Sequence, residues 1–130
     1  MAAPVRSESL SLSLAGDPVP SLLLLPREPE PVPGALLLHG YSSSKERLSS
    51  TIGRALAARG IASLAVDLPL HGTRDDALVA EARRNPLALA AQWKRALAEA
   101  DAAIRWLASH RAIDGTRIAA VGYSLGSYIA

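Results

Sequence analysis

A serine lies between two glycines close to the end of the 130-residue chain, in the run VGYSLG at residues 121–126. The apolar stretch RIAAVG, residues 117–122, ends at the first of these glycines. The segment SLGSYIA, residues 124–130, begins at the serine and can open a helix. A serine in a sharp strand-to-helix turn has a strained backbone, and close chain approach favours glycine two residues either side. Gly122 and Gly126 occupy those two positions, so Ser124 is a candidate nucleophile.

The helix expected after Ser124 would add to this chemistry. Its first turn has free backbone N–H groups and carries the positive end of the helix dipole, and both suit an oxyanion. The alternative is a serine that only caps a helix at a turn. The G-x-S-x-G pattern has few fixed residues, so its setting between a strand and a helix is what makes it specific.

The first third of the chain predicts two antiparallel strands and a loop. Residues 9–14, SLSLSL, alternate strictly and indicate a half-buried strand. Residues 16–18, GDP, predict a turn, and residues 21–25, SLLLL, a second strand. Residues 26–34, PREPEPVPG, are rich in proline, which excludes a sheet interior and favours a surface loop.

The remaining segments alternate between strand and helix. Continuous apolar runs at residues 35–38 and 61–66 predict strands that are buried on both faces. Residues 44–60 predict a helix with Leu48, Ile52 and Leu56 on one face and Gly60 as its C-cap. This alternation indicates right-handed crossovers and a mostly parallel sheet with helices on both faces.

A long helix is predicted from Asn85 to about His110. Asn85 followed by proline reads as an N-cap and a first helical residue. One stripe of this helix is apolar, and we expect it to face the core; its members are Trp93, Leu97, Ala100, Ile104 and Leu107. A turn at residues 114–116, DGT, leads into the last strand at residues 117–122.

Ligands of such sheets bind outside the carboxyl ends of the strands. Those ends read HGYSSS, DLPLHG and GYSLG in chain order. With the long helix ending AIRWLASH, these segments over residues 35–130 resemble the α/β-hydrolase superfamily, and most closely its small bacterial carboxylesterases of the dienelactone-hydrolase-like kind. The resemblance implies an α/β-hydrolase fold with the strand order 1-2-4-3-5.

The resemblance also implies roles for individual residues. Ser124 would be the nucleophile, and the backbone N–H of Leu125 would be one oxyanion donor. The second donor would come from the N–H of Tyr41, which follows His39 and Gly40. Dienelactone hydrolases often use a cysteine nucleophile, whereas this chain has serine here and no cysteine, which favours ordinary ester hydrolysis.

The histidines and the remaining charged residues near the strand ends have plainer interpretations. We expect His39 to shape the oxyanion loop through hydrogen bonds and His71 to shape the loop after the second buried strand, with a substrate contact as its alternative. His110 would interact with the negative end of a helix dipole. Asp67 is expected to bind backbone N–H groups, and residues 74–76, RDD, to form a solvated loop or cap.

No acid or histidine follows Ser124, although this fold places its catalytic Asp or Glu and then its His after the serine. We therefore expect residues 1–130 to be the N-terminal portion of one larger hydrolase domain that is inactive alone. The strand at residues 117–122 would then be an exposed apolar edge of the sheet.

Composition excludes several other classes. The net charge is +2, and although 12 of the 14 basic residues are arginine, no basic stripe with aromatic residues accompanies them, so a nucleic-acid partner is not expected. No P-loop or G-x-G-x-x-G is present, and no cysteine or histidine-supported acidic cluster predicts a metal. No signal peptide or membrane span is apparent, which predicts a cytoplasmic protein.

The sequence therefore predicts a serine hydrolase that acts on a small-molecule ester through an acyl-enzyme, without a metal or organic cofactor. A peptidase or thioesterase is the nearest alternative, because the same turn serves amides and thioesters. A hydrolase-fold binding module or remnant without chemistry is the alternative from a different class. The sequence defines no oligomeric state.

Overall fold

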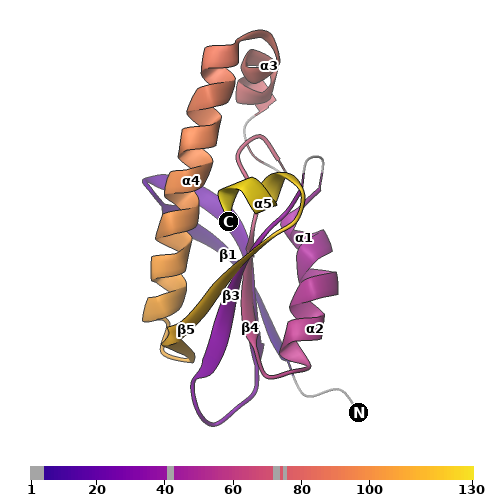
Figure 1. The fold of residues 1–130 in the computed structure, drawn as a ribbon, viewed down its shortest axis with the longest axis vertical. Helices are drawn as coiled ribbons and strands as arrows, with labels where there is room; N and C mark the ends of the chain where they lie inside the picture. The colour runs from indigo at the N-terminus through magenta and orange to yellow at the C-terminus, as the bar shows by residue number, and fades with distance from the viewer. Residues whose placement is uncertain (1–4, 41–42, 72–73, 75) are drawn as a thin grey trace.

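The computed structural model describes residues 5–40, 43–71, 74 and 76–130. They form a five-stranded sheet with helices on both faces (Figure 1). The strands are β1 (Val5–Leu14), β2 (Asp17–Pro26), β3 (Val32–Leu38), β4 (Ala62–Val66) and β5 (Ile113–Gly122). The helices are α1 (Lys45–Leu48), the π-helical turn η1 (Ser49–Gly53), α2 (Arg54–Ala57), α3 (Asp76–Arg84), α4 (Pro86–Ser109) and α5 (Leu125–Ile129).

The sheet has the order β1-β2-β4-β3-β5, which confirms the predicted order. β1 and β2 form an antiparallel pair, as expected, with Leu14 opposite Asp17 at the turn. β3 is parallel to both of its neighbours, β4 and β5. The carboxyl ends of these three strands therefore lie at one edge of the sheet, where a ligand site is expected in this architecture.

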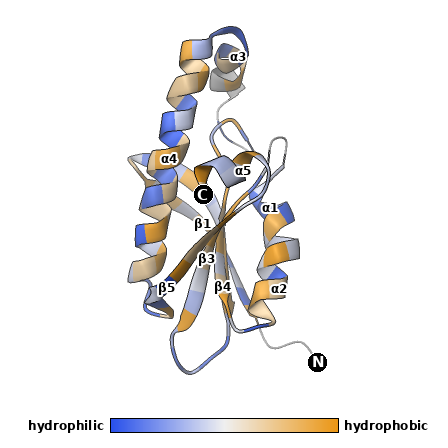
Figure 2. Cartoon of the chain, in the orientation of Figure 1, coloured by the Kyte–Doolittle hydropathy of each residue, from blue (hydrophilic) through white to orange (hydrophobic). Residues whose placement is uncertain are grey.

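Alternating side chains of β3 divide the core between the two faces of the sheet. Leu36 and Leu38 belong to a large cluster with the buried residues of α4, whereas Ala35 and Leu37 pack with Leu48 on the other face. β3 and β4 consist mostly of apolar residues, whereas β1 alternates between polar and apolar residues (Figure 2). Burial on both faces explains why β3 and β4 read as continuous apolar runs.

The helical segment between β3 and β4 has the predicted extent but an internal irregularity. Five residues in its middle form η1 rather than a regular α-helix. At its end, the Ile61 N–H donates to the Leu56 carbonyl and the Gly60 N–H to the Ala57 carbonyl, with Gly60 at φ 76. This is the Schellman arrangement, so the predicted glycine C-cap is confirmed.

The predicted N-terminus of α4 is confirmed, but its predicted core stripe is partly wrong. The Asn85 side chain accepts a hydrogen bond from the Leu87 N–H. Trp93 and Leu97 are 38% and 41% exposed, whereas Glu99, expected off the stripe, is 3% exposed. The first half of α4 extends beyond the sheet and lies beside α3, so its apolar residues do not reach the core of the sheet (Figure 1).

Several predicted boundaries are wrong near turns. Pro26 ends β2, and β3 already begins at Val32, whose N–H donates to the Ala112 carbonyl. Proline is tolerated at a strand end because no ladder hydrogen bond is lost there. The predicted DGT turn lies inside β5 as a bulge, because Ile113 pairs with Val32 but Ile118 pairs with Gly34. The GDP turn is shorter than predicted, since β2 begins at Asp17.

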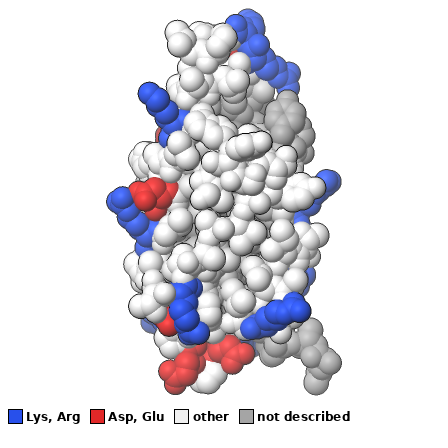
Figure 3. Space-filling model, viewed as in Figure 1, with Lys and Arg blue, Asp and Glu red and all other residues white. Residues whose placement is uncertain are grey.

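β5 lies at one edge of the described sheet, as the sequence analysis expected. Ala119 and Ala120 are exposed, and Ile118 and Val121 are half-buried. On the face shown in Figure 3, charged side chains lie around the periphery, and the middle has few. Within the described part of the chain, no helix has the length and apolarity that a bilayer span requires.

Candidate active site

Ser124 occupies the tight turn that joins β5 to α5. Its backbone has φ 52 and ψ −113, a left-handed φ that a residue with a side chain rarely adopts, and the residue is exposed. The turn is held by hydrogen bonds from the Tyr123 N–H to the Leu38 carbonyl and from the Gly126 N–H to the Tyr123 carbonyl, each 3.0 Å long. The backbone therefore presents Ser124 at the carboxyl edge of the sheet.

The two glycines around Ser124 allow the backbones to approach closely. A Cβ on Gly122 would lie 2.3 Å from the carbonyl oxygen of Gly126. A Cβ on Gly126 would lie 2.0 Å from the carbonyl oxygen of Leu38 at the end of β3. Both contacts are with backbone atoms, which cannot rotate away, so only glycine fits at either position in this arrangement.

We expect Gly126→Ala to lower the free energy of unfolding by about 3 kcal/mol, because α5 must move away from β3 to admit the methyl group. Gly60→Ala is a useful comparison, because it places alanine at a left-handed φ without a backbone clash and should cost about 1 kcal/mol. Urea denaturation of both variants measures the difference. Equal losses would mean that the contact with Leu38 is relieved without strain.

The loop after β3 lies directly against the serine. A Cβ on Gly40 would be 3.2 Å from the Ser124 Cβ and 3.3 Å from the Tyr123 carbonyl oxygen. Tyr41, expected to supply one oxyanion donor, lies outside the described residues. Leu125, expected to supply the other, is the first residue of α5, where a backbone N–H has no acceptor within the helix.

Both ring nitrogens of His39 are engaged in hydrogen bonds at the base of this loop. Nε2 accepts from the Leu68 N–H at 3.0 Å, so Nδ1 carries the proton and donates to the Gly40 carbonyl at 2.8 Å. The side chain is fully buried, and burial lowers the pKa of His39 despite the opposing hydrogen bond to Gly40. His39 is thus a neutral link between the ends of β3 and β4.

The lowered pKa of His39 predicts a loss of stability in acid. The unfolded chain binds a proton at this residue near pH 6.5, whereas the folded chain binds it only at lower pH. The free energy of unfolding should therefore fall as the pH is lowered from 7 through 6.5 toward the folded pKa. Urea midpoints between pH 5 and 8 test this, and His39→Gln should flatten the profile. An unchanged slope in His39→Gln would assign the effect to another group.

Asp67, at the end of β4, accepts two hydrogen bonds from one residue of α1. Its Oδ1 accepts from the Lys45 backbone N–H at 3.0 Å and its Oδ2 from the Lys45 Nζ at 2.7 Å. Burial disfavours the charged lysine, but hydrogen bonds to Asp67 and Glu46 outweigh it and raise the pKa of Lys45. The expected backbone contact of Asp67 is confirmed, and an ion pair accompanies it.

Residues 74–76 were expected to form a solvated loop or cap, and for Arg74 the expected solvation is wrong. Arg74 is 8% exposed and forms a bidentate ion pair with Glu99 of α4, at 2.5 and 2.7 Å. Its Nη1 also donates to the Asp67 carbonyl at 3.0 Å. Asp75 lies outside the described residues, and residue 76 begins α3, a helix that the sequence analysis missed. The pair joins the chain after β4 to α4.

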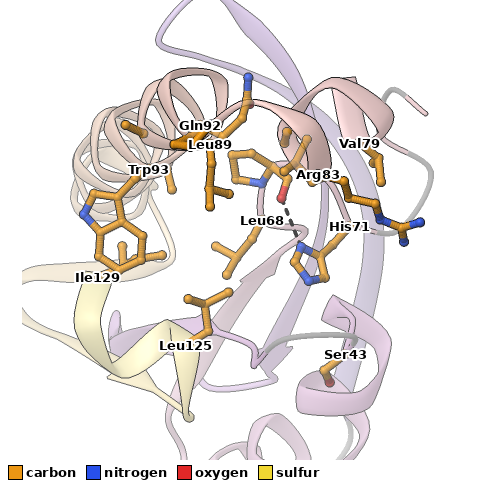
Figure 4. A pocket seen from close by; sticks show the side chains of 16 residues that line it. Ser43, Leu68, His71, Val79, Arg83, Leu89, Gln92, Trp93, Leu125 and Ile129 are labelled. Carbon is orange, nitrogen blue, oxygen red and sulfur yellow. Dashed lines mark hydrogen bonds between the residues drawn. The ribbon is translucent and has the colours of Figure 1, made fainter. Parts of the chain in front are cut away.

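A cavity of about 880 Å³ lies between this segment, α3, α4 and α5 (Figure 4). Leu125 and Ile129 line it from α5, and Leu89 and Trp93 line it from α4. His71 also lines the cavity and bonds through Nδ1 to the Pro69 carbonyl at 3.0 Å. The cavity reaches the residue that directly follows Ser124.

The structure brings some of the predicted site residues together and separates others. Ser124, Gly40 and Leu125 lie at the carboxyl edge of the sheet with His39 beneath them. His110 caps the far end of α4, where its Nδ1 accepts from the Ala112 N–H. Within the described residues, no group of three or more His, Asp or Glu side chains is arranged to bind a metal ion.

The pairing of Glu99 with Arg74 was not predicted from the sequence. The signal available was a second face of α4, which overlaps the predicted stripe at Ala100 and Leu107. Its buried members are Ala96, Glu99, Ala100, Ala103 and Leu107. A carboxylate within a stripe of alanines is expected to have a buried cationic partner, because an unpaired buried charge is costly.

Comparisons with known proteins agree with this architecture. A family model described as the alpha/beta hydrolase family matches residues 35–130, and the chain therefore belongs to that family. No curated protein matches the chain.

Solved structures similar to the chain include two esterases and a related hydrolase. A cold-adapted esterase from an Arctic intertidal metagenomic library is 26% identical with a TM-score of 0.69, covering 96% of this chain and 53% of that one. An esterase from Pyrobaculum calidifontis is 23% identical with a TM-score of 0.71, covering 96% and 37%. A dienelactone hydrolase-like promiscuous phosphotriesterase from metagenomic libraries is 21% identical with a TM-score of 0.71, covering 96% and 52%. The chain thus spans about half, or less, of the length of these structures.

Proposed function

We propose that this chain carries the nucleophile and the oxyanion loop of a serine hydrolase that cleaves carboxylic esters. The observation that carries the proposal is the strained turn at Ser124, with φ 52, between two glycines that no other residue can replace in this arrangement. Strain of this kind holds a hydroxyl at the top of a sheet, where an ester carbonyl can approach. Membership of the alpha/beta hydrolase family and the similarity to esterases support it.

In this reaction Ser124 Oγ attacks the ester carbonyl carbon while a base takes its proton, and that proton passes to the alcohol that leaves from the tetrahedral intermediate. The N–H of Leu125, and that of Tyr41 after Gly40, would donate hydrogen bonds to the oxyanion. Each such donor contributes about 3–4 kcal/mol in the transition state. Water then attacks the acyl-enzyme and releases the acid.

We propose that the catalytic base and acid come from outside residues 1–130. His39 is fully buried with both ring nitrogens bound to the backbone, and His110 lies at the opposite end of α4 from the serine. Neither arrangement suits a base that takes a proton from Ser124. His71 lines the cavity, and we assign it the shaping of the loop after β4.

We also propose that residues 1–130 belong to one domain, since α3 packs on α4 and the other elements pack on the sheet. The cytoplasmic location stays a prediction.

Peptidase or thioesterase activity is the closest alternative, and comparison of p-nitrophenyl acetate with the matching anilide and thioester separates them. A hydrolase-fold module without chemistry would cleave none of the three.

Labelling by a fluorophosphonate probe tests the nucleophile. The complete gene product should be used, because the chain spans about half of the length of the similar esterases. We expect one label per chain, absent in Ser124→Ala and retained in Ser50→Ala, which replaces an exposed serine of η1. A label that persists in Ser124→Ala would remove Ser124 from this role.

A further inference from the structure

The apolar cavity begins one residue from Ser124. Leu125 and Ile129 lie one helical turn apart on α5, and both line the cavity, so this helix connects the serine to it. Figure 4 shows Leu125 on one side of the space and Leu89 on the other. A group covalently attached to the reacting carbonyl could therefore extend between α5 and α4.

The lining is mostly aliphatic, proline or aromatic, and the polar residues in it are Ser43, His71, Arg83 and Gln92. His71 Nδ1 donates to the Pro69 carbonyl, and Gln92 Oε1 accepts from Arg95. Arg83 is the one charged residue among the described residues of the lining; it is exposed, and its guanidinium points away from the cavity (Figure 4). Such a lining favours an uncharged occupant, because a charge loses its hydration there without a partner.

The side of the cavity formed by α4 presents apolar surface to water. Leu89 is 54% exposed and Trp93 is 38% exposed, although both belong to the cavity wall. The volume of about 880 Å³ falls in the range of ligand pockets, which are mostly apolar. An apolar occupant would remove this surface from water, which is favourable.

We propose that this cavity binds an uncharged apolar arm, acyl or alcohol, of the carboxylic ester, an inference that rests on the function proposed for Ser124. Leu89 and Trp93 of α4 then determine the preferred length of that arm. Leu87, which lies on the same helix, is 80% exposed and does not line the cavity, so it provides a matched control.

Two ester series measured with the complete gene product test the proposal. One compares p-nitrophenyl hexanoate with p-nitrophenyl acetate, and the other compares hexyl acetate with methyl acetate. In the series whose variable arm occupies the cavity, kcat/KM should rise by about threefold per methylene. We expect Leu89→Asp to reduce the long-to-short ratio at least tenfold and Leu87→Asp to leave it unchanged.

A binding measurement separates this inference from the proposed function. Tryptophan fluorescence should change saturably with 1-hexanol but not with ethanol, and the change should be absent in Trp93→Phe and at least tenfold weaker in Leu89→Asp. Such binding without hydrolysis or fluorophosphonate labelling would uphold the cavity assignment and refute the proposed function. Hydrolysis with a long-to-short kcat/KM ratio near one in both series would overturn the assignment. A length preference that Leu89→Asp retains in full would also overturn it, as would the absence of both saturable binding and any length preference.

Discussion

Replacement of Ser124 by alanine in the complete gene product is expected to lower kcat for p-nitrophenyl acetate by about a millionfold. The expected size is that found for serine proteases, in which loss of the nucleophile alone lowers kcat about as much as loss of the whole catalytic triad. The residual rate would come from the oxyanion donors that we propose at Leu125 and Tyr41, which do not depend on the hydroxyl. Initial rates under saturating substrate measure the effect.

The same measurement needs a serine control and a folding control. Ser50 of η1 is exposed, and its replacement by alanine should leave kcat within about twofold, since surface changes have little effect. The urea midpoint of Ser124→Ala should not fall below that of the wild type. This control is needed because a variant that unfolds would lose activity for a reason unrelated to the nucleophile. A loss of less than about tenfold in a folded Ser124→Ala would refute the nucleophile assignment.

Glu99→Ala is expected to lower the free energy of unfolding by about 3–5 kcal/mol. The substitution leaves the guanidinium of Arg74 buried without its carboxylate, and removal of one partner of a buried ion pair is strongly destabilising. It also removes one of the two carboxylates, Glu99 and Asp17, to which Arg95 Nε donates at 3.1 Å each. Urea denaturation monitored by circular dichroism gives the change.

Two further variants distinguish the buried charge from a general effect of glutamate loss. Glu81 is exposed and lies 3.7 Å from Arg84, so Glu81→Ala should cost less than about 0.5 kcal/mol. The double variant Arg74→Met/Glu99→Leu should recover most of the stability, because apolar residues of similar size often replace a buried pair without loss. A cost for Glu99→Ala no larger than that for Glu81→Ala would contradict this account.

The sheet and the serine turn were predictable because their signals are local. β3 and β4 read as continuous apolar runs, since parallel strands covered on both faces have no polar side. The turn around Ser124 was predictable from Gly122 and Gly126, because backbone contacts as short as those of Gly126 with Leu38 admit no side chain. These features depend on residue types within a few positions of one another.

The buried face of α4 could not be predicted correctly from its pattern. Two overlapping faces of this helix carry apolar residues, and hydrophobicity favours the one with Trp93 and Leu97. The structure buries a neighbouring face, on which Ala96 and Ala103 join the correctly predicted Ala100, because small side chains let a helix approach the sheet closely. Trp93 lies where the helix borders the cavity.

The sequence by itself determined the alternation of strands and helices and the candidate nucleophile at Ser124, because propensity, apolar runs and glycine requirements act over short separations. The strand order was implied only by the resemblance of its motifs to the α/β-hydrolase superfamily. Only the tertiary structure decided which charged side chains form ion pairs and which backbone groups bind the ring nitrogens of His39. Glu99 meets Arg74 across 25 residues, and His39 accepts from Leu68 across 29. Such partners are chosen by the approach of separate elements and by the cost of leaving a buried polar group unpaired, which no local pattern contains.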